Sequence, residues 1–211
     1  MEKTRALRQS DTGECDVGAV FWDRQMDIIE AHVADAKAKG AEVLVGGRRN
    51  PELEGLYFEP TVVTGVDHGM DLMTKETFGP ILAVKKVKDE EEAMHLANDS
   101  EYGLNGNVWT TDREKGQRLA EQMETGGVCV NDMALTYGVP VAPFGGVKSS
   151  GIGQVNGAQG LRGYCHPHPI IADKKGTGNI QGGYPYTAKS EAGMQKFIRI
   201  LFGSPLGRWL A

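Results

Sequence analysis

Two short segments of the sequence place polar or aromatic side chains beside glycines, at points where strands are expected to begin or end. The first is Glu76-Thr77-Phe78-Gly79-Pro80, in which a carboxylate and an aromatic ring lie two residues apart immediately before a β-rich run. Such a turn can project both side chains from a strand end, where α/β proteins bind their ligands. Composition alone favours the alternative, a solvated Glu76 beside a core Phe78.

The second segment, residues 142–153, is a glycine-punctuated loop that follows a predicted strand. It contains Gly151 and Gly153 separated by one residue, a spacing found in loops that hold phosphate groups. A dinucleotide fingerprint also requires a direct strand-to-helix context, which this segment lacks. The loop is therefore weak evidence for a phosphate site.

None of the three cysteines is placed as a catalytic nucleophile or metal ligand. Cys15 lies in a polar loop among carboxylates, which disfavour a thiolate. Cys129 lies between two valines in a predicted strand, where packing is its expected role. Cys165 is followed by two histidines interleaved with prolines, but no fourth ligand follows at zinc spacing. The sequence predicts neither a catalytic residue nor a metal site.

The other histidines are His32, His68 and His95, and none has a serine or cysteine partner in view. His32 and His95 fall within predicted helices, and His68 falls in a turn. We expect surface or satisfied core positions for all three.

Composition and charge exclude several functional classes. The 211 residues are 40% hydrophobic and 24% charged, which allows a folded core. A net charge of −5 without a dense basic run argues against a nucleic-acid partner. No stretch approaches the ~20 apolar residues of a spanning helix, and the first residues lack an apolar signal region. Three cysteines without a C-x-x-C pair fit a reducing compartment, so we expect a cytoplasmic protein.

Apolar spacing predicts alternating strands and helices. A helix begins after Asp23, which is expected to be its N-cap, and is followed by a strand over residues 42–45. Residues 57–63 are β-rich but contain Pro60, which predicts an edge or irregular strand. Strands over residues 81–87, 106–110 and 128–131 alternate with two helices, one that begins after Asp89 and one that runs from Asp112 through Glu124. This order predicts an α/β fold with a mostly parallel sheet.

Beyond Pro140 the regular pattern fades, until an amphipathic stripe at Met194, Phe197, Ile198 and Leu201 predicts a final helix. We therefore divide the chain into a domain over residues 1–165, a Gly/Pro-rich irregular segment over 166–187, and a helical tail over 188–211. The tail could lie on a membrane surface, but docking on the protein itself or on a partner subunit is the favoured alternative.

The two glycine-flanked segments together resemble the aldehyde dehydrogenase superfamily. E-T-F-G-P-I-L and, sixty-odd residues later, P-F-G-G-V-K-S-S-G-I-G are similar to family motifs in both order and spacing. The resemblance runs from about residue 2 to residue 165, and implies a partial catalytic domain with Gly-rich loops. After S-G-x-G the family usually continues with Arg or Lys and an acidic residue, whereas this chain has Gln154-Val155-Asn156.

The resemblance implies roles for four residues. Glu76 matches the glutamate that holds the nicotinamide ribose, a task suited to two acceptor oxygens. Phe78 matches the phenylalanine near the nicotinamide ring. Phe144 falls where the family has a wall of the substrate passage, and Asn131 is expected near the same passage.

The family's nucleophilic Cys, its general-base Glu and its dinucleotide-binding domain lie upstream of the region that this chain resembles. We therefore expect the C-terminal part of an NAD(P)-dependent aldehyde dehydrogenase, inactive alone and binding neither NAD nor NADP by itself. The alternative is a stand-alone scaffold, or one half of a split enzyme that acts through a partner chain. The expected partners are further copies of the chain or a missing N-terminal cofactor domain. The sequence selects neither the aldehyde nor NAD over NADP.

Overall fold

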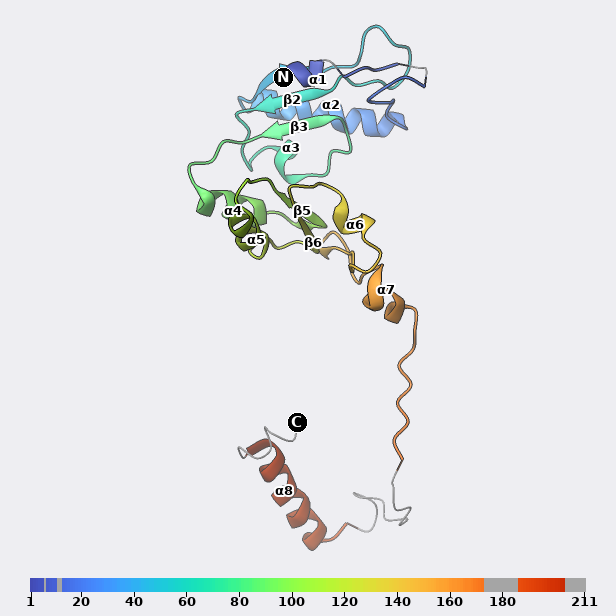
Figure 1. The fold of residues 1–211 in the computed structure, drawn as a ribbon, viewed down its shortest axis with the longest axis vertical. Coiled ribbons are helices and arrows are strands. Elements are labelled where there is room, and N and C mark those ends of the chain that lie inside the picture. The colour runs from blue at the N-terminus through green and yellow to red at the C-terminus, as the bar shows by residue number, and fades with distance from the viewer. Residues whose placement is uncertain (6, 11–12, 173–185, 204–211) are drawn as a thin grey trace. The chain divides into compact units, whose positions relative to one another are not determined.

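The computed structural model describes residues 1–5, 7–10, 13–172 and 186–203 (Figure 1). The chain divides into one unit over Met1–His166 and a second over Pro167–Ala211. Residues 204–211 of the expected tail, and residues 173–185 of the Gly/Pro-rich segment, lie outside the described residues. The three-part division of the chain stays a prediction.

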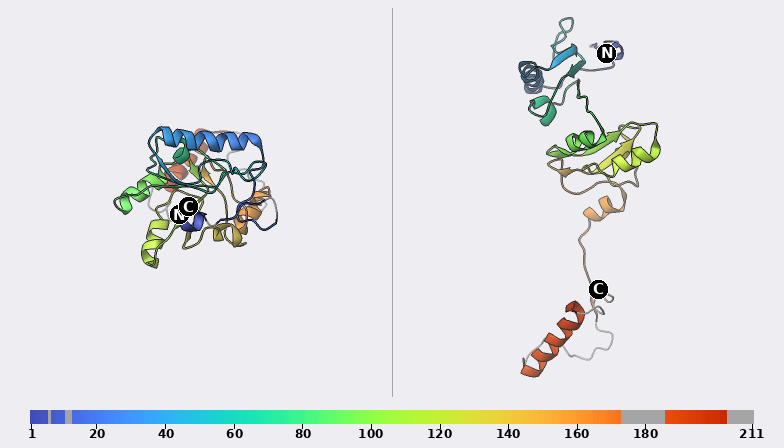
Figure 2. Two further views of the ribbon diagram at one scale, coloured as in Figure 1. Left: turned by 90° about the horizontal axis from the view of Figure 1, so that it is seen from above. Right: turned by 90° about the vertical axis from the view of Figure 1, so that its left-hand side faces the viewer.

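The first unit begins with a short helix, α1 (Glu2–Arg5), and a three-stranded sheet in the order β1-β2-β3. The strands are β1 (Glu42–Val45), β2 (Thr61–Thr64) and β3 (Ile81–Val84); β2 is antiparallel to β1 and parallel to β3. Helix α2 (Asp23–Ala38) lies along the strands (Figure 2), and the short α3 (Asp71–Thr74) adds Leu72 to the core. The predicted helix and the predicted strand over residues 42–45 are therefore confirmed.

The prediction that residues 57–63 form an edge strand is wrong. Strand β2 lies between β1 and β3, and its first three residues are buried. Pro60 immediately precedes the strand, so the ladder loses no donor, and the N–H of Thr61 donates to the carbonyl of Pro80 at 2.8 Å. The alternative of an irregular segment holds for residues 57–60, where Phe58 makes only an isolated bridge to Arg49.

The remainder of the first unit is a βαβ arrangement with a second small sheet. Strands β5 (Asn105–Val108) and β6 (Gly127–Val130) are parallel, and the helix between them, α5 (Arg113–Ala120), packs on both. Strand β4 (Tyr102–Gly103) pairs antiparallel with β7 (Val147–Lys148). The α/β class is confirmed, although in the described part of the chain the strands form three separate sheets and β3 does not pair with β5.

Two of the three predicted helix caps are confirmed. The carboxylate of Asp89 accepts from the N–H of Glu92 at 2.8 Å at the start of α4 (Glu90–Asn98), and Asp112 accepts from Lys115 at 3.0 Å at the start of α5. Asp23 is not an N-cap: it is the first residue of α2, and the N-cap position is held by Trp22.

Helix α5 ends at Ala120, although its predicted extent reached Glu124. The amide of Asn98, at the end of α4, donates to the carbonyl of Gln122 at 2.8 Å and accepts from the N–H of Glu124 at 2.9 Å. These two bonds hold the backbone in a non-helical path.

Two short helices complete the first unit, α6 (Leu135–Gly138) and α7 (Gly157–Gly163). In the second unit, α8 (Ala188–Gly203) forms where the final amphipathic helix was predicted, and Met194, Phe197, Ile198 and Phe202 on it are exposed. No helix within the described ranges has the length and apolar character needed to cross a membrane.

Candidate functional site

The turn between α3 and β3 presents Glu76 and Phe78 to solvent. Glu76 is exposed, and Phe78 is 71% exposed with φ of 44°, a left-handed conformation that is uncommon for an aromatic residue. Within the described ranges the Glu76 carboxylate makes no hydrogen bond or ion pair. The interpretation of Phe78 as a core residue is therefore wrong, and both side chains are available to a ligand.

Helix α2 holds this turn from the inside. The Nε2 of Gln25 donates to the carbonyl oxygen of Thr77 at 2.5 Å, and the Nδ1 of His32 lies 2.9 Å from the Thr77 hydroxyl. Gly79 is packed so closely on Ile29 that a Cβ there would lie 2.6 Å from Cγ1 of the isoleucine. The turn is thus attached to α2 by two hydrogen bonds and one close packing contact.

The two motifs of the sequence meet at one cavity of about 480 Å³. Glu76 lines it from the first motif, and Ser149 and Ser150 line it from the second. The N–H of Gly103, on β4, donates to the Ser150 hydroxyl at 2.9 Å, which fixes the second motif against the strand. The other lining residues are Ala97, Ser100, Tyr102, Leu104, Asn105, Met123 and Thr125.

The other two residues that the sequence analysis assigned to the site, Phe144 and Asn131, lie outside this cavity. Phe144 is half-buried and packs edge-on against Tyr137, with ring centroids 5.2 Å apart. Asn131 accepts from the N–H of Thr110 and donates to its carbonyl, both at 2.8 Å, so its amide closes the end of β5 and β6. Neither residue lines the 480 Å³ cavity, nor does Phe78. Their roles in a substrate passage or beside a nicotinamide ring stay predictions.

The sequence reasoning missed Gln25 and His32 as residues that hold the turn, and Ser149 and Ser150 as cavity residues. One local signal was available: Gln25 and His32 lie seven residues apart on the apolar face of α2. Ser149 and Ser150 lie in the second motif that the sequence singled out, but nothing in the sequence indicated that they approach Glu76, because this approach depends on contacts between distant segments.

The cysteines lie away from this cavity. Cys129 is 5% exposed in β6, Cys15 is partly exposed, and the thiol of the exposed Cys165 lies 3.6 Å from the carbonyl of Leu161. None of the three lines the cavity. In the part of the chain that the structure describes, no three His, Cys, Asp or Glu side chains are grouped to hold a metal ion.

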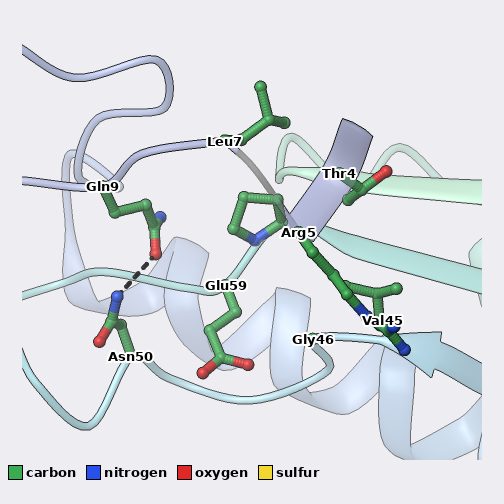
Figure 3. A pocket seen from close by; sticks show the side chains of 9 residues that line it. Thr4, Arg5, Leu7, Gln9, Val45, Gly46, Asn50 and Glu59 are labelled. Atoms are coloured by element: carbon green, nitrogen blue, oxygen red, sulfur yellow. Dashed lines mark hydrogen bonds between the residues drawn. The ribbon is translucent and has the colours of Figure 1, made fainter. Parts of the chain in front are cut away.

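A smaller cavity of about 230 Å³ lies between the N-terminal residues and the segment around Glu59 (Figure 3). Three of its polar side chains are engaged with neighbours: the amide of Asn50 donates to Gln9 at 3.1 Å, and Glu59 pairs with Arg48 at 3.1 Å. The 480 Å³ cavity, which has the unpaired Glu76 carboxylate, is the stronger candidate site.

The stability of the first unit should fall in mild acid because of His32. Burial lowers the pKa of this imidazole; Lys75 lowers it further, whereas Asp71 and Asp35 oppose the shift. The unfolded chain therefore takes up a proton near pH 6.5 before the folded chain does, and the free energy of unfolding decreases as the pH falls from about 6.5 to the folded pKa, by at most ~1.4 kcal/mol per pH unit. Urea unfolding at pH 7.5 and 5.5 measures this, and the difference should be smaller in His32→Phe.

The sequence model of the aldehyde dehydrogenase family matches residues 1–170. A 4,4'-diapolycopene aldehyde oxidase of Methylomonas sp is 39% identical over 189 residues, which cover 89% of this chain and 35% of the relative. Among solved structures, a betaine aldehyde dehydrogenase mutant of Staphylococcus aureus with NAD+ is 38% identical with a TM-score of 0.72, over 77% of this chain and 34% of that one. A Mycobacterium tuberculosis aldehyde dehydrogenase complexed with NAD+ is 37% identical with a TM-score of 0.73, over the same 77% and 34%.

The chain thus spans about a third of the length of the relatives that it matches. The residues matched by the family model include both motifs at the 480 Å³ cavity. This chain belongs to the aldehyde dehydrogenase family.

Proposed function

We propose that this chain supplies the nicotinamide-ribose side of the cofactor site of an NAD(P)-dependent aldehyde dehydrogenase. One observation carries the proposal: the unpaired Glu76 carboxylate lies at a cavity that is also lined by Ser149 and Ser150. A carboxylate without a protein partner suits a ligand that brings its own donors, and two vicinal ribose hydroxyls are such donors. The residues present therefore fit a nicotinamide nucleotide.

Each of the four site residues has a definite task in this proposal. Glu76 accepts hydrogen bonds from the two ribose hydroxyls, and the exposed ring of Phe78 packs against the nicotinamide and restricts its rotation. Phe144, with Asn131 nearby, forms part of the wall of the substrate passage. A bound dinucleotide would supply the hydride acceptor for the oxidation of an aldehyde to a carboxylic acid, in which water provides the second carboxyl oxygen.

The complete reaction requires residues beyond those of this chain. We propose that the dinucleotide-binding region is supplied by an N-terminal part of the enzyme, joined to this chain or provided as a separate chain, and that the assembly is oligomeric and cytoplasmic. In such an arrangement, Glu76 and Phe78 would hold the nicotinamide end of the cofactor.

Replacing Glu76 with Gln tests this role. With the N-terminal region supplied in trans, we expect Glu76→Gln to weaken NAD binding about ten-fold, because an amide offers one acceptor oxygen in place of two and loses the charge. Isothermal titration calorimetry measures the dissociation constant. Glu91→Gln, at an exposed position of α4, is the matched control and should bind like the wild type. Equal affinity for the wild type and Glu76→Gln would contradict the proposed role.

A further inference from the structure

The buried face of α2 contains two polar side chains that a simple core would not contain. Gln25 is 8% exposed and His32 is 7% exposed, among the fully buried Met26 and Ile29 and the nearly buried Val33. Burying an amide and an imidazole is unfavourable unless their polar atoms are hydrogen-bonded. Both side chains bond to the same residue, Thr77: one to its backbone carbonyl and the other to its hydroxyl. The polar positions of α2 are therefore explained by the turn that they hold.

Thr77 lies between Glu76 and Phe78, so its orientation determines theirs. Along an extended or turning backbone, successive side chains point in different directions, and a Thr77 hydroxyl directed at α2 leaves its neighbours directed outward. The left-handed backbone of Phe78 is strained, and such a conformation persists only where the surrounding structure holds it. The attachments to Thr77, together with the packing of Gly79 on Ile29, provide that restraint.

We propose that His32 is a positioning residue, which holds the Glu76-Thr77-Phe78 turn in its outward-facing conformation through the Thr77 hydroxyl and releases it in acid. The importance of this turn for the enzyme rests on the proposed function, but the attachment itself does not. A neutral imidazole can accept or donate at Nδ1, and a protonated ring can still donate to the Thr77 hydroxyl. Release in acid therefore comes from the cost of charging a ring that is only 7% exposed, and not from the loss of a possible donor.

The surroundings of His32 favour the neutral ring at physiological pH. Burial disfavours its charged form, and the nearby ionised groups partly oppose one another: Asp35 on α2 itself and Asp71 on α3 favour the charge, and Lys75 after α3 opposes it. Lys75 is itself paired with Asp71 at 2.8 Å. A fall in pH therefore charges a ring that burial keeps neutral, next to the hydroxyl that attaches the turn.

Hydrogen exchange of the full chain, without any cofactor, tests the attachment. The measured quantity is the exchange rate of the backbone amides in residues 75–81, corrected for intrinsic rates at pH 7.0 and 5.5. His32→Phe and Thr77→Val remove one partner each, and Thr77→Ser keeps the hydroxyl. His95→Phe is the matched control, because it makes the same His-to-Phe substitution at an exposed position of α4.

At pH 7.0 we expect His32→Phe and Thr77→Val to speed exchange in residues 75–81 about five-fold, the factor for one ordinary hydrogen bond. Amides of β6 should stay within about two-fold of the wild type, and Thr77→Ser and His95→Phe should exchange like the wild type. The wild type should show faster exchange in the turn at pH 5.5, and the two disrupting variants should lose this difference.

Unchanged exchange in the turn for both disrupting variants would overturn the proposal. An equal increase of the exchange rate in the turn and in β6 would also overturn it, because His32 would then be an ordinary core residue. The same holds if Thr77→Ser exchanges as fast as Thr77→Val. Because no cofactor is present, these outcomes do not depend on whether Glu76 binds a ribose, which the Glu76→Gln titration decides separately.

Discussion

The purified chain should show no NAD(P)-dependent oxidation of short, long or aromatic aldehydes above a control without protein. In the family the aldehyde first reacts with a cysteine thiolate, and that covalent step makes the hydride transferable. No thiol lines the cavity at Glu76, and Cys129 is buried in β6. Loss of a covalent nucleophile removes several orders of magnitude in rate, which residual binding does not replace.

Cofactor binding by the isolated chain should be equally absent. Two hydrogen bonds from ribose hydroxyls to a carboxylate contribute ~1.5 to 3 kcal/mol each, and association costs at least ~4 kcal/mol. Little net affinity remains, so calorimetry with millimolar NAD should show no saturable heat. The same chain with the N-terminal region in trans is the positive control.

Each of these two predictions has a result that would contradict it. Tight NAD binding by the chain alone would show that the site at Glu76 is more complete than the cavity indicates. Turnover that disappears in Cys129→Ala would make that buried thiol a substitute nucleophile, and would also require β6 to open.

Gly126→Ala should lower the free energy of unfolding of the first unit by about 3 kcal/mol. Gly126 lies directly against the backbone of the P-F-G-G segment, and a methyl group there would overlap the carbonyl oxygen of Gly145. Its N–H also donates to the carbonyl of Gly103 at 3.0 Å, so the backbone cannot move away without loss of that bond. Overpacking of this kind costs ~1 to 3 kcal/mol, and backbone contacts lie at the upper end.

Urea unfolding of Gly126→Ala and Gly138→Ala measures this effect. Gly138, in α6, has no atom within 4 Å of the position that its Cβ would take, so its alanine variant should stay within about 0.5 kcal/mol of the wild type. Equal stability of the two variants would show that the second motif is not held against the start of β6.

Most helices and strands of this protein could be predicted from its sequence. Apolar spacing placed α2, and the carboxylates of Asp89 and Asp112 marked the starts of α4 and α5. These features depend on residues three or four positions apart, so they can be read along the chain. The end of α5 could not be read in this way, because the amide of Asn98 ends it from another helix.

The family motifs also came from the sequence alone, including Glu76 and Phe78 as the pair most suited to a nucleotide. Tertiary structure decided the rest. The sheet order placed β2 at the centre, and packing from distant segments brought Ser149 and Ser150 to the cavity of Glu76. The attachment of His32 to Thr77 likewise joins residues 45 positions apart. Local sequence periods do not encode such contacts, since these form only when separate elements pack together.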